Sequence, residues 1–431
     1  MQEIKITRAA TLKEKPKASE LVFGKYMTDH MFIVDYDEGQ GWHDARIVPY
    51  GPLPIDPASK VLHYGEEIFE GMKAYRTADG SIQLFRPDCN IQRLNDSADR
   101  LCLPNIPYEL ALAGIVELVK LEQDWVPYEK DTSLYIRPFM IGIDPALGVH
   151  SSHHVQYIVI VCPVGAYYPE GLNPVKIYIE DEDVRAVKGG TGMAKTGGNY
   201  AASLRAGNRA EKRGYSQVLW LDGVHRKYIE EVGAMNVMFK VGGKILTPDL
   251  NGSVLPGITR RSCIQLLKDW GYEVEERRIS AEELFEAAKN GTLEEGWGTG
   301  TAAVISPIGE LAEGDEKVII NGEETRLNYG ALELTEDGTY EVGVVVNGKT
   351  YTFTTVVDCS VDYNINVHDK GFANTVTLNA NENVTLTMTK DGEPMEYKLG
   401  TEILEPGVYT VKMVDALGNT KEQVADNQPL L

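Results

Sequence analysis

Runs of apolar residues divide the chain into strands and helices. The segments 133–149 (SLYIRPFMIGIDPALGV) and 154–168 (HVQYIVIVCPVGAYY) are rich in β-branched and aromatic residues, which favours strands. The short apolar run QVLWLDG at 217–223 predicts a buried strand. The segment 236–248 (NVMFKVGGKILTP) predicts a hairpin, because Gly-Gly at its centre permits the positive φ angles of a two-residue turn.

Two segments carry helix boundary signals. In GITRRSCIQLLKDWG the helix is expected to begin just after Pro256 and to end at Gly271, since proline suits a helix start and glycine a helix end. In SAEELFEAAKNG the pair Ser280 and Glu283 predicts a capping box, and Gly291 predicts the stop. The mixture of strands and helices predicts an α/β (α+β) fold for this part of the chain.

The composition and the pattern of strands and helices change along the chain and predict three domains: 1–169, 170–330 and 331–431. The first two mix strands with helices. In the third, Thr, Val, Asn and Gly dominate, and Asn-Gly and Asp-Gly pairs separate short apolar runs. Regularly spaced hairpins of this kind predict an all-β, sandwich-like tail.

Composition excludes several classes of protein. The net charge of −22 repels phosphate backbones, so no nucleic-acid partner is expected. The five cysteines form no CxxC pair and the histidines show no metal-ligand spacing, so neither a disulfide framework nor a metal site is expected. No apolar run has the roughly 18–20 residues of a membrane helix, and the polar N-terminal segment lacks the apolar centre of a signal peptide. We therefore expect a soluble, cytoplasmic protein with no membrane contact.

The segment 188–206 (KGGTGMAKTGGNYAASLRA) places Lys195 among five glycines. Small residues let the backbone approach a flat, bulky group, and a lysine in such a place can lose its proton and attack an aldehyde. The competing interpretation is a flexible surface loop with a solvated lysine. This segment alone favours neither of the two.

Three further segments suggest groups that bind a cofactor or an anion. Glu231 precedes an apolar strand, where its carboxylate is able to pair with a protonated pyridine nitrogen; an exposed strand-edge glutamate is the alternative. In SVLPGITRRS the N–H groups of Ile258 and Thr259 open a helix and suit a phosphate, to which Arg93 adds a guanidinium. In GWGTGTAAVISP, Thr301 and nearby amides suit an anion. The last two segments have an ordinary turn as their alternative, but four such features in one chain favour a cofactor site.

Together these segments resemble a known family. The chain is similar to the fold-type IV aminotransferases, and specifically to the branched-chain amino-acid aminotransferases of the larger, eukaryote-like subgroup, over most of its first 322 residues. The matching motifs are LVFGK, LHYGEEIFEGMKAYR, LFRP, QRL, SLYIRP, ALGV, PVGAYYPEG, KTGGNYAASL, QVLWLDG, EEVGAMN, LPGITRRS and GTGTAAV. The resemblance implies a small domain at 1–169 and a large cofactor-binding domain at 170–330. The tail resembles immunoglobulin-like repeats of bacterial surface proteins.

The resemblance also implies a cofactor and roles for individual residues. Pyridoxal 5′-phosphate would form a Schiff base with Lys195, which would also shuttle the substrate proton. The remaining cofactor-binding residues would be Arg93, Tyr200, Glu231, Ile258, Thr259 and Thr301. The substrate-binding residues would be Phe23, Tyr64, Tyr135, Arg137, Val149, Tyr167 and Ala302. Val149 would reach into a neighbouring subunit, which implies a homodimer, and Arg137 would serve the distal carboxylate of glutamate.

The expected activity is reversible transfer of the amino group between L-leucine, L-isoleucine or L-valine and 2-oxoglutarate. A D-amino-acid aminotransferase or an aminodeoxychorismate lyase of the same fold is an alternative, against which the SLYIRP and LVFGK motifs argue. A surface interaction protein with a vestigial enzyme domain is the alternative from another class. The chain departs from many vertebrate relatives at Ala234, where they have threonine, and at Ala303 and Ser306, where they have a redox pair of cysteines.

Overall fold

The protein divides into two compact units, Met1–Glu324 and Thr325–Leu431. The computed structural model describes residues 3–165, 174–314 and 316–320 of the first unit. In the second it describes 338–346, 349–357, 364–369, 374–379, 385–398, 401–403, 407–414 and 420–427. The predicted domain boundaries after residues 169 and 330 both fall outside the described residues, so they stay predictions.

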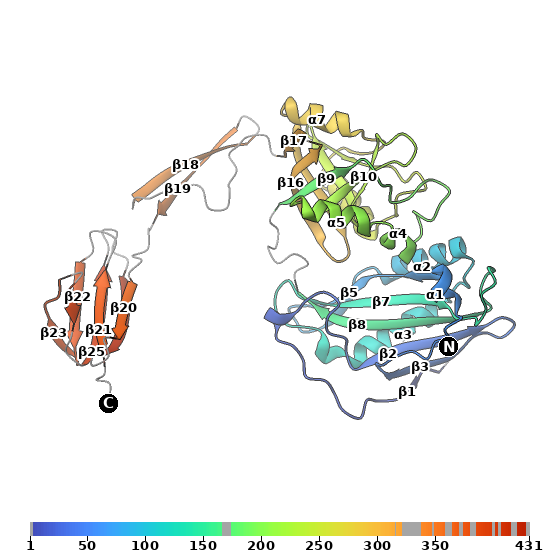
Figure 1. Cartoon of the computed structure of the whole chain (residues 1–431), viewed down its shortest axis with the longest axis horizontal. Coiled ribbons are helices and arrows are strands. Elements are labelled where there is room, and N and C mark those ends of the chain that lie inside the picture. The colour runs from blue at the N-terminus through green and yellow to red at the C-terminus, as the bar shows by residue number, and fades with distance from the viewer. Residues whose placement is uncertain are drawn as a thin grey trace. The chain divides into compact units, whose positions relative to one another are not determined.

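The first unit contains two sheets, which are blue to cyan and green to gold in Figure 1. The first sheet has the order β1-β3-β2-β8-β7-β5-β6, with β4 paired to β7. Its strands are β1 (Lys5–Ile6), β2 (His30–Asp37), β3 (Gly41–Pro49), β4 (Glu67–Phe69), β5 (Met72–Arg76), β6 (Ile82–Leu84), β7 (Ser133–Gly142) and β8 (His154–Val164). The helices of this part are η1 (Ala18–Glu20), α1 (Lys60–Tyr64), α2 (Pro87–Leu101), α3 (Tyr108–Leu121) and η2 (Gln123–Trp125). Strands β7 and β8 confirm the two strands predicted from the sequence.

The two faces of β7 have different surroundings because successive residues of a strand point to opposite sides. Leu134 and Ile136 belong to the main core of this part, which forms where α3 packs on β2 and β3 and also against α2. Tyr135 lies on the opposite face, in a small cluster with Cys162 and Val164 of β8. Apolar burial on one face therefore fixes the register of β7 and turns Tyr135 and Arg137 to the other.

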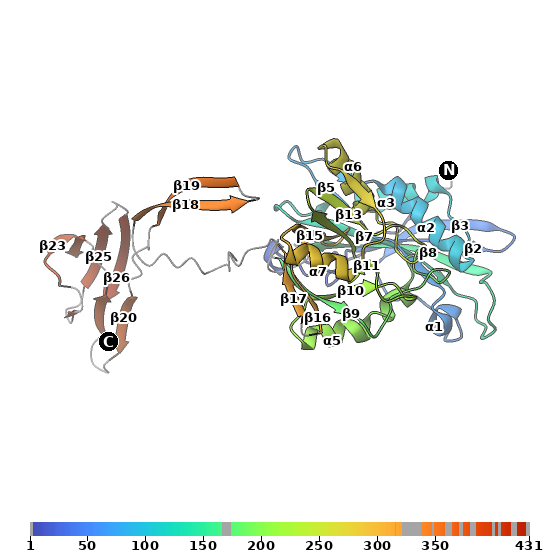
Figure 2. The same ribbon diagram turned by 90° about the horizontal axis from the view of Figure 1, so that it is seen from above.

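The second sheet has the order β11-β10-β9-β16-β15-β12-β13-β14, with β17 paired to β16. Its strands are β9 (Val175–Glu180), β10 (Gln217–Leu221), β11 (Ile229–Val232), β12 (Asn236–Val241), β13 (Lys244–Thr247), β14 (Val274–Glu276), β15 (Leu293–Gly300), β16 (Val304–Glu313) and β17 (Glu316–Ile319). The helices are α4 (Gly197–Ala201), α5 (Leu204–Lys212), α6 (Ile258–Asp269) and α7 (Ala281–Lys289). Helix α5 packs on β9 and β10, α6 on β14 and β15, and α7 on β15 and β17 (Figure 2).

Most local predictions for this region are confirmed. Strands β12 and β13 pair as a hairpin, and the turn glycines Gly242 and Gly243 have φ angles of 55° and 79°. Helix α6 begins after Pro256 and Gly257, and Gly271 follows its end with a φ of 87°. The capping box at α7 is half formed. Ser280 accepts a hydrogen bond from the Glu283 N–H, but the Glu283 carboxylate pairs with Arg277 instead of returning to the backbone of Ser280.

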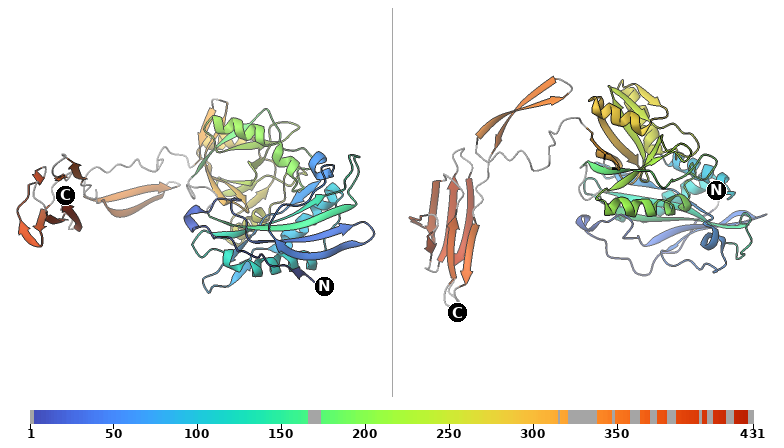
Figure 3. Two further views of the ribbon diagram at one scale, coloured as in Figure 1. Left: turned by 60° about the horizontal axis from the view of Figure 1, so that its bottom comes forward. Right: turned by 45° about the horizontal axis from the view of Figure 1, so that its top comes forward.

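Most described residues of the second unit lie in strands, which form three sheets (Figures 1 and 3). Strands β18 (Gly338–Val346) and β19 (Lys349–Val357) form one hairpin; β20 (Asn364–Asp369), β21 (Asn374–Asn379) and β24 (Glu402–Ile403) form a second sheet. Strands β22 (Thr385–Lys390), β23 (Glu393–Met395), β25 (Gly407–Val414) and β26 (Thr420–Asn427) form the third. The predicted Asp-Gly hairpin is confirmed at Asp391 and Gly392, while the Asn-Gly turn at 347–348 lies outside the described residues. Among the helices described anywhere in the chain, none is long and apolar enough to cross a membrane.

Candidate active site

A cavity of about 420 Å³ in the first unit collects most of the predicted site residues. This volume lies within the range of about 300–1,000 Å³ that is usual for ligand sites. Eleven predicted residues line the cavity: Phe23, Arg93, Tyr135, Arg137, Lys195, Tyr200, Glu231, Ile258, Thr259, Thr301 and Ala302. They come from strands of both sheets and from the helices and loops that follow them, so the cavity depends on how the two sheet-containing parts of this unit meet.

Lys195 is held in the cavity by backbone contacts to the first sheet and to α2. Its N–H donates to the Ser97 hydroxyl at 3.0 Å, and its carbonyl accepts from the Phe69 N–H at 2.9 Å. Its Nζ donates to the Tyr200 hydroxyl at 2.7 Å and lies 4.8 Å from the centre of the Phe69 ring. Burial, and then the nearby Arg93 guanidinium, lower the pKa of Lys195 to about 8. About a tenth of this amine is therefore neutral and nucleophilic at pH 7, against far less for an ordinary lysine. The contacts to Ser97, Phe69 and Tyr200 exclude the solvated surface lysine.

One end of the cavity is built to receive an anion. Helix α6 begins there with Gly257 as its N-cap and no side-chain cap, so the N–H groups of Ile258 and Thr259 are left for a ligand. Arg93, which is 6% exposed, donates to the carboxylate of Glu70 from Nε at 2.7 Å and from a terminal nitrogen at 3.0 Å. A third N–H donates to the Pro256 carbonyl at 3.0 Å, which leaves two of the five guanidinium N–H groups for the cavity.

Glu70 fixes this arginine and is itself fully buried. It also accepts hydrogen bonds from the Asn90 amide at 2.7 Å and from the Gly71 N–H at 3.0 Å. Burial alone would raise its pKa, but the Arg93 guanidinium, the Lys195 charge and the Asn90 amide hold the pKa of the Glu70 carboxyl below its ordinary value. The sequence predicted Arg93 but missed Glu70, although Glu70 stands inside the quoted motif LHYGEEIFEGMKAYR.

Glu231 lies on β11 and is only 3% exposed, so the interpretation as an exposed strand-edge glutamate is wrong. Its carboxylate accepts a hydrogen bond from the Leu255 N–H at 2.6 Å and pairs with the Arg185 guanidinium at 3.1 Å. Burial raises the pKa of Glu231, and the Arg185 charge and the Leu255 N–H oppose that rise. A buried carboxylate of this kind suits a cationic nitrogen on a ligand.

Arg137 and Tyr135 form another wall of the cavity from neighbouring positions on one face of β7. A terminal nitrogen of Arg137 donates to the Tyr135 hydroxyl at 3.1 Å, and the guanidinium lies 4.7 Å from the Phe69 ring centre. The Phe23 ring packs edge-on against Tyr135 at 4.8 Å. Among the described residues the buried Nε of Arg137 has no hydrogen-bond partner. The wall is thus aromatic, with one guanidinium whose donors are only partly used.

The structure leaves two predicted substrate-binding residues, Tyr64 and Val149, away from this group. Tyr64 on α1 is 45% exposed, and its hydroxyl donates to the Leu147 carbonyl. Val149, in the loop between β7 and β8 that also holds Leu147, is 84% exposed. Neither Tyr64 nor Val149 lines the cavity of a single chain. Tyr167 lies outside the described residues.

The glycines around Lys195 do not have the role that the sequence suggested for them. Residues 189, 190, 192, 197 and 198 do not line it, which corrects the reason given for them from the sequence. A Cβ on Gly192 would lie 2.2 Å from the Ser253 carbonyl oxygen, so this glycine permits two backbone segments to meet. Gly257, at the cavity itself, makes room for a side chain, because its Cβ would lie 1.9 Å from the side-chain amide oxygen of Asn236.

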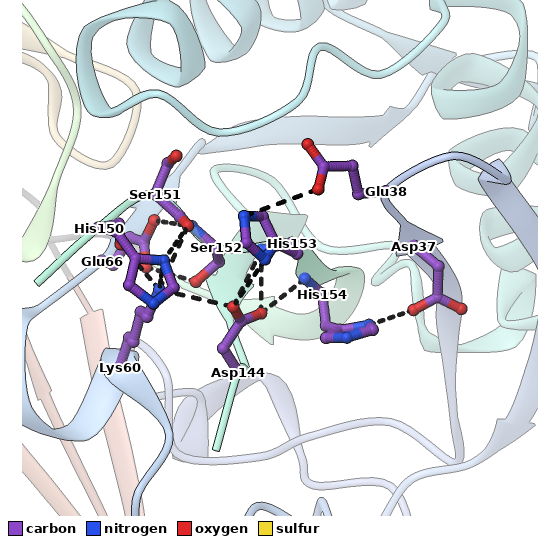
Figure 4. Close-up of polar contacts among 10 residues, drawn as sticks. All are labelled: Asp37, Glu38, Lys60, Glu66, Asp144, His150, Ser151, Ser152, His153 and His154. Atoms are coloured by element: carbon purple, nitrogen blue, oxygen red, sulfur yellow. Dashed lines mark hydrogen bonds and ion pairs between the residues drawn. The ribbon is translucent and has the colours of Figure 1, made fainter. Parts of the chain in front are cut away.

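A second polar cluster, shown in Figure 4, was not expected from the sequence. Asp144, His150 and His153 place their ligand atoms within 4.8 Å of one another. The fully buried Lys60 also reaches this cluster: its Nζ donates to His150 Nδ1 at 2.6 Å and lies 3.5 Å from Asp144. Asp144 accepts the backbone N–H groups of His153 and His154 as well. The ammonium of Lys60 thus already balances the carboxylate, and the cluster ties the loop between β7 and β8 to α1.

Comparisons with known proteins agree with this arrangement. The family amino-transferase class IV matches residues 67–311, more than half of the chain. The chain is 56% identical over 324 residues to branched-chain-amino-acid aminotransferase 2 of Bacillus subtilis, an alignment that covers 75% of this chain and 89% of that protein. It is 54% identical over 345 residues to a probable branched-chain-amino-acid aminotransferase of Staphylococcus aureus, covering 79% and 96%.

Solved structures show the same fold. The branched-chain amino acid aminotransferase of Escherichia coli superposes with a TM-score of 0.56 at 28% identity, over 68% of this chain and 88% of that one. A T.th. branched-chain amino acid aminotransferase with pyridoxamine 5′-phosphate superposes with a TM-score of 0.54 at 29% identity, over 64% and 85%. On the family match, the sequence identities and the shared two-sheet fold, this chain belongs to the class IV amino-transferases.

Proposed function

We propose that this protein is a branched-chain amino-acid aminotransferase that moves an amino group reversibly between L-leucine, L-isoleucine or L-valine and 2-oxoglutarate, with pyridoxal 5′-phosphate as cofactor. The observation that carries the proposal is the position of Lys195. Its amine, with a pKa of about 8, lies in a cavity that has an anion-binding end and a buried carboxylate. The names of the relatives, and the pyridoxamine 5′-phosphate bound to the T.th. enzyme, support it.

The residues present fit the cofactor at both of its charged ends. A dianionic phosphate suits the open N–H groups of Ile258 and Thr259, the Thr301 hydroxyl and the two remaining donors of Arg93. The buried Glu231 carboxylate suits the protonated ring nitrogen, and Tyr200 would hydrogen-bond the ring hydroxyl. When bound, pyridoxal 5′-phosphate supplies an aldehyde that captures amines and a cationic ring that withdraws electrons from the substrate Cα–H bond.

Lys195 would hold the cofactor covalently and then carry the proton. Its lowered pKa lets the free amine accept a proton from the substrate Cα, as a general base with a pKa near the working pH does. The Tyr200 hydroxyl, 2.7 Å away, orients the amine within the cavity. The Phe69 ring beside the amine keeps water from this side of the reacting atoms.

The wall formed by Tyr135, Arg137 and Phe23 would select the substrates. Burying a branched side chain against such rings contributes about 1.5–3 kcal/mol. Arg137 would bind the distal carboxylate of glutamate or 2-oxoglutarate with the donors that the protein leaves unused. One cavity would therefore accept an apolar side chain in one half-reaction and a carboxylate in the other.

We also propose that the enzyme works as a homodimer and belongs to the larger, eukaryote-like subgroup. The loop between β7 and β8 presents Leu147 and Val149, which are 62% and 84% exposed, beside the 45% exposed Tyr64. Apolar side chains so exposed suit contact with a second copy, where Val149 and Tyr64 would complete the substrate pocket. The C-terminal unit would be an immunoglobulin-like module that supplies no catalytic group.

The test is a visible spectrum of the purified protein, followed by a screen of amino donors. The protein should be yellow, L-leucine should shift the visible band, and Lys195→Ala should abolish turnover while keeping the fold. Lys240→Ala is the matched control, because Lys240 pairs with Glu294 away from the cavity. Turnover of D-alanine or of aminodeoxychorismate in place of L-leucine would support the two alternatives of the same fold. Native turnover by Lys195→Ala would reject the proposal.

A further inference from the structure

Lys73, on β5 of the first sheet, is a buried lysine that the roles assigned so far do not use. It is 6% exposed, and its Nζ donates to the Ala302 carbonyl at 2.9 Å, across 229 positions of sequence. In the part of the chain that the structure describes, its ammonium forms no ion pair. Burial lowers the pKa of Lys73 to about 8. An unpaired buried ammonium is costly, so this lysine needs an explanation.

The turn Gly300–Ala303, between β15 and β16, separates Lys73 from the active-site cavity. Ala302 and Ala303 line that cavity, and Lys73 does not. Lys73 instead lines a second cavity of about 180 Å³, and Gly300 and Thr301 border both. The N-terminal residues of α6, Ile258 and Thr259, also border both cavities. Lys73 therefore lies directly behind the turn and close to the positive end of a helix.

The contact to Ala302 determines where the next N–H points. A trans peptide is planar, so its C=O and N–H point in opposite directions. Because Lys73 holds the Ala302 carbonyl on its own side, the N–H of Ala303 points the other way, toward the cavity that Ala303 lines. The following residue, Val304, has a φ of 59°, a conformation that a β-branched residue adopts only when its surroundings hold it there.

We propose that Lys73 is a positioning residue for the substrate α-carboxylate. It holds the Gly300–Ala303 turn so that backbone N–H groups face the carboxylate, and its charge behind the turn strengthens the attraction. This inference rests on the proposed function and adds a residue to the same site. The carboxylate is common to the amino acid and the 2-oxo acid, so the effect applies to every substrate of the reaction.

The experiment compares a carboxylate ligand with its neutral analogue. Binding of 4-methylpentanoate and of 4-methylpentanamide to the cofactor-loaded enzyme is measured by titration calorimetry, together with kcat and KM for L-leucine. Lys73→Met removes the charge and the donor, Lys73→Gln keeps a donor without charge, and Lys73→Arg keeps both. Lys240→Met is the control for loss of a partly buried lysine outside the site.

We expect Lys73→Met to weaken binding of 4-methylpentanoate about tenfold, as loss of one partly screened charge interaction does. Binding of the amide should change much less, KM for leucine should rise more than kcat falls, and Lys73→Arg should restore the acid affinity. Equal losses for acid and amide, or no loss, would overturn the inference. If Lys73→Met does not fold, Lys73→Gln and Lys73→Arg are compared instead. Equal affinities of these two variants for 4-methylpentanoate would reject a role for the Lys73 charge. A wild-type enzyme without a visible band or leucine turnover would instead refute the proposed function.

Discussion

The buried pair of Glu70 and Arg93 allows a quantitative prediction from the substitution Glu70→Gln. Glu70 is 0% exposed and accepts four hydrogen bonds, two of them from Arg93. Glutamine keeps the shape of the Glu70 side chain but removes its charge. Its amide NH2 group must face a hydrogen-bond donor, because every partner of the Glu70 carboxylate is a donor. Arg93 then remains buried without an anion to balance it.

The size of the effect should depend on the cofactor. Breaking a buried ion pair by removing one partner costs about 3–5 kcal/mol, because the other charge is left uncompensated. We expect a loss of this size in the apo-protein. In the loaded protein the cofactor phosphate would balance Arg93, so the loss should be clearly smaller. By linkage, pyridoxal 5′-phosphate should bind the variant more tightly than the wild type.

Denaturant unfolding of the apo and loaded forms measures both losses, and equilibrium dialysis measures the affinity for the cofactor. Glu180→Gln is the matched control: Glu180 is 2% exposed and pairs with Arg209, whose side chain is 21% exposed and therefore partly solvated. Its loss should be smaller, about 1–3 kcal/mol, and equal in the two forms. Equal losses in both forms of Glu70→Gln, or weaker cofactor binding, would show that the phosphate does not balance Arg93.

Three further outcomes are expected. The rate at which the apo-protein captures pyridoxal 5′-phosphate, followed by absorbance, should rise with pH and level off above about 8, because burial lowers the Lys195 pKa to that value; a plateau near 10.5 would contradict it. Between pH 8 and 10.5 the Lys195 amine is protonated in the unfolded chain but not in the folded one. The free energy of unfolding of the apo-protein should therefore rise with pH over this range. Arg137→Met should raise KM for 2-oxoglutarate about 10–100-fold, as loss of a charged hydrogen bond does. Exchange between leucine and 4-methyl-2-oxopentanoate should be spared, because neither has a distal carboxylate. If stopped-flow half-reactions show equal losses with 2-oxoglutarate and with leucine, Arg137 has no selective role. A chain shortened after Gly330 should keep cofactor and activity but lose solubility or thermal stability, and an inactive shortened chain that still melts cooperatively would give the tail a part in the site.

The sequence predicted those features that depend on neighbouring residues. Strands β7 and β8, the β12–β13 hairpin, and the ends of α6 all follow from apolar runs, glycine turns and a proline, which act over a few positions. The candidate site residues were found because each lies in a short motif. Eleven of them line one cavity, as a shared function requires.

Pairings between distant segments could not be predicted in this way. Glu70 and Arg93 are 23 positions apart, Lys73 and Ala302 are 229 apart, and Arg185 has no motif that points to Glu231. The first of these contacts forms where α2 packs near β4, the third lies within the part built on the second sheet, and only Lys73–Ala302 joins the two sheets. The prediction that the glycines line the cavity was wrong for a similar reason. Gly192 is needed because the Ser253 backbone, about sixty positions away, lies too close for a Cβ, and a local sequence pattern does not reveal such a contact.

The two-faced surroundings of β7 limit how this enzyme can evolve. Its even-numbered positions near Leu134 face the core, and Tyr135 and Arg137 face the substrate cavity. Inserting or deleting one residue within Ser133–Gly142 would exchange the two faces, placing a guanidinium in the core and an aliphatic side chain in the pocket. New substrate preferences are therefore accessible by substitution inside this strand, whereas changes of length are tolerable only beyond its ends.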